Sequence, residues 1–179
     1  MSELSVGTLS GLAANSYVID VASGSQLTQP GMILQVVSLI KSDVFATTST
    51  SLVDITGLSV AITPVSTSSK VMLFCDGLAG NSASVTTVVR LFRDLTAIAP
   101  GAGTLGSGAN TADLHNGTVT THSTMPFAFS ILDTPGTTSE VTYKVKMASE
   151  SGGTAYLNRR GANAALGGCT TITLMEVAG

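Results

Sequence analysis

The feature that most constrains this chain is an alternation of apolar and polar side chains with a period of two. In residues 141–147 the odd positions are Val, Tyr, Val and Met, and the even positions are Thr, Lys and Lys. This period places successive side chains on opposite faces of an extended strand. Turn residues flank the run at 133–136 (DTPG) and 151–153 (SGG). The pattern predicts a strand with one face in the core and the other in water.

Similar segments recur along most of the chain, separated by Gly, Pro, Asn, Asp or Ser. Residues 84–98 come closest to a helical period, but their Val and Thr content favours a strand. Many short strands separated by turns predict an all-β fold, an antiparallel β-sandwich with the jelly roll as the leading topology. The expected strands are 32–40, 43–48, 51–63, 69–77, 84–98, 117–132, 139–148, 153–158 and 169–177.

The alternation changes phase at Gly57. Before this glycine the apolar residues are Val53 and Ile55, at odd positions, and after it they occupy the even positions 58, 60 and 62. One extra residue in a strand sends all later side chains to the other face, which is the effect of a β-bulge. Glycine suits a bulge because it adopts positive φ without steric cost. We therefore expect a bulged strand whose two halves both face the core.

The composition indicates one domain with hidden apolar surface. The chain has 179 residues, of which 11% are charged and 44% hydrophobic, whereas a typical soluble domain has ~25% charged residues. We therefore expect other copies to cover part of the surface. The net charge of −3 offers no electrostatic footprint for nucleic acid. The longest apolar run, 32–40, is far shorter than the ~20 residues of a membrane helix, and we expect neither membrane insertion nor a signal peptide.

Residues 1–31 differ from the rest of the chain. They are rich in Ser, Gly, Ala and Asn, contain one strand-like piece at 17–21 (YVIDV), and close with the turn pair Pro30-Gly31. We place a boundary there. Residues 1–31 are expected to be an N-terminal docking or oligomerisation segment, and residues 32–179 a jelly-roll-like sandwich domain.

No motif indicates nucleotide binding or catalysis. Residues 101–106 (GAGTLG) match the dinucleotide fingerprint, but Pro100 precedes them, no helical pattern follows, and residues 119–129 contain no acid. We interpret them as a glycine-rich loop. The eleven carboxylates lie singly along the sequence, so no pair suggests a glycosidase, although two acids meeting across the sandwich stay an alternative.

The histidines and cysteines are the remaining candidate ligands. His115 and His122, with Asp113, invite a metal or triad interpretation, but seven residues of extended chain place the two imidazoles on opposite faces. We interpret them as polar loop and edge residues, and Asn116-Gly117-Thr118, a formal glycosylation sequon, as a turn. We interpret Cys75 and Cys169 as buried thiols, with a disulfide between two strands as the alternative. The chain has no CxxC pair, so we predict no metal, cofactor or catalytic site.

Four stretches carry a family resemblance. They are DVFATTSTSLVDITGLSVAITPVSTSSKV (43–71), ILDTPGTTSEVTYKVKM (131–147), GTAYLNR (153–159) and TITLMEVAG (171–179). Together they resemble a group of small bacteriophage structural proteins, often found in marine and cyanobacterial phages, that are described as tail-fibre-like or virion proteins. The resemblance spans about 32–179 and implies a β-sandwich that forms trimers and is exposed on a phage particle. The group has no active site to carry across.

We therefore expect a non-enzymatic virion structural protein. It would decorate or brace the particle as a homotrimer, as a capsid decoration protein or a tail-associated fibre component, with residues 1–31 contacting other virion proteins. The expected location is the surface of the phage particle, after synthesis in the host cytoplasm. The alternative is a receptor-binding tail-fibre module that recognises a host surface glycan or protein through the loops 100–116 and 159–168.

Overall fold

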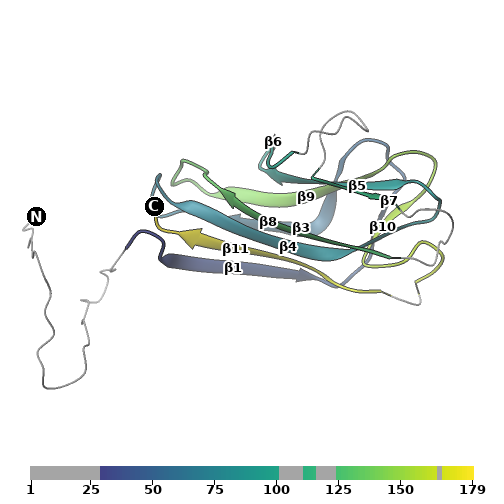
Figure 1. Cartoon of the computed structure of the whole chain (residues 1–179), viewed down its shortest axis with the longest axis horizontal. Coiled ribbons are helices and arrows are strands. Elements are labelled where there is room, and N and C mark those ends of the chain that lie inside the picture. The colour runs from purple at the N-terminus through teal and green to yellow at the C-terminus, as the bar shows by residue number, and fades with distance from the viewer. Residues whose placement is uncertain (1–28, 101–110, 116–123, 165–166) are drawn as a thin grey trace, which may run out of the picture.

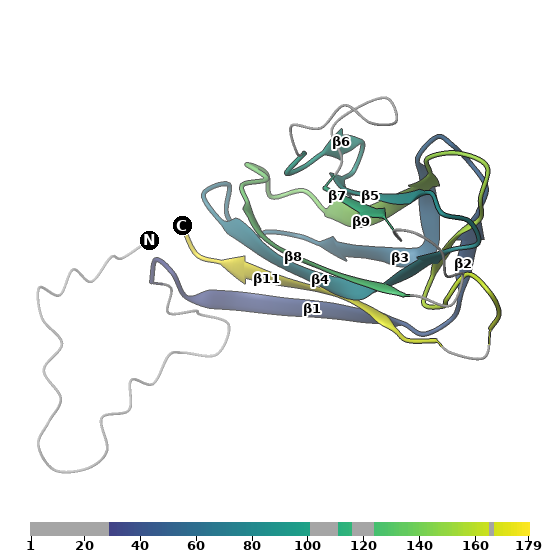
Figure 2. The ribbon, with the colours of Figure 1, turned by 45° about the vertical axis from the view of Figure 1, so that its right-hand side comes forward.

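The protein is an all-β sandwich of two antiparallel sheets (Figures 1 and 2). The computed structural model describes residues 29–100, 111–115, 124–164 and 167–179, which form no helix. Sheet A contains β1 (Ile33–Lys41), β2 (Phe45–Thr47), β4 (Lys70–Asn81), β8 (Met125–Asp133), β10 (Ala155–Leu157) and β11 (Thr170–Val177). Sheet B contains β3 (Val53–Ile62), β5 (Thr86–Arg93), β6 (Thr96–Ala97), β7 (Ala112–His115) and β9 (Val141–Ser149).

The strand pairing is that of a jelly roll. Several short strands lie end to end and act as one interrupted strand, which we call a strand line. β1 and β2 form one strand line, β10 and β11 another, and β6 and β7 a third along one edge of β5, so the sandwich has eight antiparallel strand lines. Numbered along the chain, the first line pairs with the eighth, the second with the seventh, the third with the sixth and the fourth with the fifth. This order is a hairpin folded and rolled into two Greek keys. The expected β-sandwich is confirmed.

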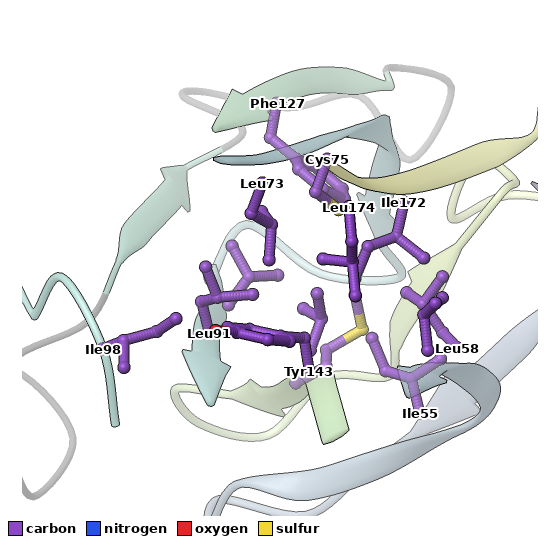
Figure 3. Close-up of a cluster of buried hydrophobic side chains, with 14 of the residues drawn as sticks. Ile55, Leu58, Leu73, Cys75, Leu91, Ile98, Phe127, Tyr143, Ile172 and Leu174 are labelled. Atoms are coloured by element: carbon purple, nitrogen blue, oxygen red, sulfur yellow. The ribbon is translucent and has the colours of Figure 1, made fainter. Parts of the chain in front are cut away.

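The core lies between the two sheets and follows from the alternation within each strand. In β9 the odd residues from Val141 to Met147 are buried, while Thr142, Lys144 and Lys146 are partly exposed. β11 follows the same rule with Ile172 and Leu174 buried. Figure 3 shows side chains of both sheets meeting in one cluster, including Leu58, Leu73, Leu91, Tyr143 and Leu174.

The bulge at Gly57 is confirmed and is larger than expected. Gly57 has φ +77°, and the pairing with β9 shifts from Asp54↔Lys146 to Ser59↔Lys144. The strand therefore advances five residues while its partner advances two, an excess of three where the sequence predicted one. An odd excess still reverses the phase, and both Ile55 and Leu58 are buried.

One expected strand and one expected loop differ from the structure. The segment 84–98 is broken into β5 and β6 by a tight turn in which Asp94 has φ +53°, so the single strand was wrong. The backbone bond from Asp94 N to the Thr142 carbonyl, 2.7 Å, holds this turn against β9. The loop predicted at 100–116 contains β7, because Val88 and Val89 of β5 offer an open edge that pairs with residues 112 and 113.

Several expectations fall partly outside the described residues. The strand expected at 117–132 begins at Met125 in β8, and residues 116–123 are not described. The boundary expected at residue 31 lies two residues before β1, where Gly31 and Met32 bond to Ala178. The docking role of residues 1–31 stays a prediction, since residues 1–28 are not described.

One polar cluster joins the two sheets inside the sandwich. Asp133 of β8 accepts hydrogen bonds from Arg93 Nη1, 2.6 Å, and from the Tyr143 hydroxyl, 2.7 Å. Arg93 and Tyr143 belong to sheet B, and the Arg93 and Asp133 side chains are mostly buried. Burial and the neighbouring Asp133 raise the pKa of the Tyr143 phenol, which stays protonated and keeps donating.

Candidate interaction surface

The outer face of sheet A carries a row of apolar side chains across four strands. Val36 of β1 lies opposite Met175 of β11, Met175 opposite Met72 of β4, and Met72 opposite Leu132 of β8. Val36 is 54% exposed and Leu132 53%, and the two methionines are half-buried. We call these four residues the apolar row. Residues in one cross-strand row have neighbouring side chains, so the row is a continuous apolar surface.

The next two rows on one side of the apolar row carry a single charge. One row is Ser38, Thr173, Phe74 and Ser130, and the next is Ile40, Thr171, Asp76 and Ala128. Short polar side chains and the exposed Phe74 therefore flank the apolar row on this side, and the exposed Lys70, opposite Val177, lies on its other side. The sequence did not predict the row, because its four members lie far apart in the chain and only the register brings them together.

Exposed apolar side chains also gather at one edge of sheet A. Of the nine large hydrophobic side chains exposed in the described residues, five lie between residues 32 and 44, in and beside β1. They are Met32, Ile33, Val36, Ile40 and Val44. Single exposed apolar residues are ordinary, but a contiguous patch marks a surface for contact with another molecule.

The outer face of sheet B is charged. Asp54 of β3 accepts hydrogen bonds from Lys144 Nζ at 3.0 Å and lies 3.2 Å from Lys146 Nζ. Lys146 also sits 4.8 Å from the centre of the Phe92 ring, a cation–π contact. Burial of the Asp54 carboxyl opposes its ionisation, but the two lysines outweigh this effect and lower the pKa of Asp54.

An open groove lies where sheet A has a gap. The line of β10 and β11 is interrupted opposite residues 77 and 78 of β4, because β11 pairs only as far as Asp76 and β10 starts at Ala79. Residues of β4 and β8 line the groove together with Cys169, among them Leu78, Pro126 and Phe127. Its wall is apolar with one carboxylate, that of Asp76.

The predicted absence of a metal or catalytic site stays a prediction, since the structure describes only some of the residues concerned. His115 ends β7 and its Nδ1 lies 3.3 Å from the Thr86 hydroxyl. Asp113 lies two residues earlier on the same strand, whereas His122, residues 101–110 and Asn116 fall outside the described residues. Within the described part of the chain, no three His, Cys, Asp or Glu side chains gather as a metal site would require. The described residues also contain no helix able to cross a membrane.

The two cysteines have different environments. Both are free thiols, so the alternative of a disulfide is wrong. Cys75 is buried in β4, as expected, and burial raises the pKa of its thiol to about 12. Cys169 is exposed just before β11, so the expectation of burial is wrong for this residue, which lies in the loop that joins the two halves of one strand line.

The loop 159–168 is held by its own polar contacts where it is described. The Arg159 guanidinium stacks 4.0 Å from the centre of the Tyr156 ring, and Arg160 donates two hydrogen bonds to Asn163. Asn158, buried before this loop with φ +63°, donates to the carbonyls of Lys41 and Asp43 and accepts from Thr170. Asn158 thus connects the break between β1 and β2 with the break between β10 and β11.

Comparison with known proteins gives structural likenesses only. No family model matches the sequence, and no curated protein matches it. The chain is similar to the crystal structure of the infectious bursal disease virus VP2 subviral particle, with a TM-score of 0.41 and 15% identity over 92% of this chain and 42% of that one. For the Gx strain of the same virus the TM-score is 0.40 and the identity 14%, over 89% of this chain and 42% of that one. The chain spans less than half the length of these proteins, and its assignment as a jelly roll rests on its own strand pairing.

Proposed function

We propose that this chain is a non-enzymatic structural protein of a virus particle and that it works as an assembly of copies. The observation that carries the proposal is the apolar row with the cluster beside β1, which leaves one sheet of the sandwich partly apolar toward its surroundings. Such surfaces are covered in obligate assemblies. The resemblance of residues 43–71 and 131–147 to bacteriophage virion proteins supports the same conclusion. The finer proposal is a homotrimer that decorates or braces a phage particle.

The occupant of this surface is further copies of the chain. Only 11% of the residues are charged, and the outer face of sheet A contributes few of these. Interfaces between obligate subunits are depleted in charge and rich in methionine and aromatic side chains, as are the apolar row and Phe74. The charged outer face of sheet B suits contact with water.

Two measurements test this proposal. The mass of the purified chain at micromolar concentration should be three times 18.0 kDa by light scattering. A reconstruction of the whole particle should place copies of the chain at its capsid or tail. Copies at capsid threefold sites indicate decoration, and a few copies at the tail indicate a fibre component. A monomer that is absent from purified particles would overturn the proposal.

The groove favours a second candidate, a receptor-binding module. Its apolar wall beside the Asp76 carboxylate combines a hydrophobic surface with a hydrogen-bond acceptor, as sites for small ligands often do. The jelly roll also occurs in lectins, although that is analogy at the level of the fold. The test is adsorption of phage carrying Asp76→Ala. A loss of adsorption with unchanged particle assembly favours the receptor-binding function, and unchanged adsorption removes it.

A further inference from the structure

The four edges of the two sheets differ in how they are protected from pairing with other strands. β8 carries Pro126, which lacks a backbone donor, and the line of β6 and β7 is short and interrupted. β3 carries the bulge at Gly57 and the charged Asp54. Proline, bulges, short strands and charges are the usual devices that keep sheet edges from associating.

β1 lacks such protection along most of its length. It has nine residues without proline, and after one irregularity between Ile33 and Gln35 its pairing with β11 is regular. Its one charged residue, Lys41, is buried and bonded to Asp43 at 2.7 Å. Within the described residues no strand pairs with the other edge of β1. A long, apolar, open edge is a template for strand addition.

The chain itself contains a segment suited to this edge. Residues 17–21 (YVIDV) are the strand-like piece of the N-terminal segment, with β-branched and aromatic residues. Residues 1–28 carry two charges, Glu3 and Asp20, and β1 has no carboxylate, so pairing brings no like charges together. The eight residue steps from Val21 to Gln29, the first residue that the structure describes, reach roughly 28 Å when extended, a span that allows residues 17–21 to lie against a neighbouring copy.

The hydrogen bonds at the start of β1 favour a neighbouring copy as the acceptor. Gly31 N donates to the Ala178 carbonyl and Ala178 N donates to the Met32 carbonyl, both at 2.8 Å. These residues therefore bond on the side of β1 that faces β11, away from the free edge. The chain that precedes β1 therefore leaves on the β11 side, so a strand from another copy reaches the free edge more directly than the same copy's own segment does.

We infer that residues 17–21 of one copy add as a strand to the free edge of β1 in the next copy. The inference rests on the proposed function, because it specifies how the copies associate. The contact is heterologous, with a donor segment on one copy and an acceptor edge on another, and such contacts form a ring when the rotation between copies closes. Three copies joined in this way form the proposed trimer.

The first test introduces a block on each side of the contact in the full chain. Ile40→Lys places a charge at the most exposed of the large hydrophobic residues of β1, 69% exposed, and Ile19→Pro removes a backbone donor from the added strand. Each variant should run as an 18.0 kDa monomer at a concentration where the wild type is a trimer. Leu95→Lys, at an 86% exposed residue of the β5–β6 turn, and Leu12→Pro, outside residues 17–21, are the matched controls and should stay trimeric.

The second test mixes the two blocked chains. The Ile19→Pro chain keeps an intact β1 edge, and the Ile40→Lys chain keeps an intact donor segment. The mixture should therefore form a complex of two chains, near twice 18.0 kDa, that neither chain forms alone. If residues 17–21 pair with β1 of their own copy, mixing has no effect, and that result overturns the inference.

Two other outcomes also overturn it. A trimeric Ile40→Lys chain would show that the β1 edge is not an interface. Dissociation by Ile40→Lys but not by Ile19→Pro would show that a different element covers the edge. In both cases a wild-type assembly found on the particle leaves the proposed function standing, so the two failures are distinguishable. Melting temperatures within a few degrees of the wild type confirm that each variant is folded.

Discussion

The two outer faces of this sandwich differ in the side chains that they present. Sheet A presents the apolar row from Val36 to Leu132, flanked on one side by serine, threonine and the Phe74 ring and on the other by the exposed Lys70. Sheet B presents Asp54 bridged to two lysines, with a lysine over the Phe92 ring. The two sheets share one core and nearly the same strand length, so stability of the domain does not explain the difference.

The contrast indicates that the faces meet different surroundings. Charged pairs such as Asp54 with Lys144 cost little at a surface in water and are expensive to bury. An apolar row exposed to water brings no stability to a monomer, and covering it releases about 25 cal/mol per Å² of apolar area. We therefore propose that sheet A contacts other copies and that sheet B faces solvent. Adjacent residues of β8 face opposite ways. Leu132 points out of sheet A, whereas Asp133 points into the sandwich.

The largest effect on stability is expected from Asp133→Ala. This change leaves Arg93 and the Tyr143 hydroxyl without their shared acceptor between the sheets. Because both groups are mostly buried, the free energy of unfolding should fall by about 2–4 kcal/mol. Urea unfolding at low protein concentration measures it, and Glu140→Ala, at an exposed carboxylate, is the control. A loss below about 1 kcal/mol would mean that the cluster does not hold the sheets together.

The next effect concerns association and uses the neighbouring residue. Leu132→Lys places a charge at the end of the apolar row, and we expect the association constant to fall tenfold or more, equivalent to about 1.4 kcal/mol. The free energy of unfolding should hardly change, since the side chain is 53% exposed. Ala61→Lys, on the outer face of sheet B, is the control. Sedimentation equilibrium measures both variants, and equal losses would remove the distinction between the faces.

A smaller effect is expected on the acid side of the stability profile. Glu176 is buried beside Met175 and accepts hydrogen bonds from the Gln35 side chain and the Val65 amide. Burial opposes the ionisation of Glu176, but the hydrogen bonds outweigh this effect and lower the pKa of Glu176. Its ionised form therefore stabilises the fold above the unfolded pKa of about 4.3, and the contribution is lost as pH falls through the folded value. Glu176→Gln should lose less stability than the wild type between about pH 5 and 3. The free energy of unfolding is measured by urea titration at each pH. An equal loss for both proteins between pH 5 and 3 would contradict this prediction.

The smallest effect is expected on the charged face. Asp54→Asn removes the negative charge that Lys144 and Lys146 share, but the Asp54 side chain is more than half exposed. We expect a loss of at most about 1 kcal/mol in the free energy of unfolding, with no change in assembly mass. The difference should shrink in 1 M salt, where exposed charges are screened. A change in assembly mass would show that sheet B also contacts other copies.

The strands could be predicted where alternation and turn residues agree. The segment 139–148 corresponds to β9 and 169–177 to β11, each within two residues. The prediction failed at 84–98, where Val and Thr content suggested a continuous strand and a turn at Asp94 divides it. A local pattern does not report whether the partner strand continues beside it. β7 was missed for the same reason, since its pairing with β5 is a tertiary contact.

The sequence by itself determined the class of this protein. Period-two alternation, β-branched residues and frequent turns require a sheet with one buried face, and the phase change at Gly57 requires a bulge. Only the tertiary structure decided which strands are neighbours, because register joins residues that are distant in the chain. That register lines up Val36, Met175, Met72 and Leu132, and it leaves β1 at an open edge. The surface assigned to assembly is therefore a property of the pairing and is not visible in any single segment.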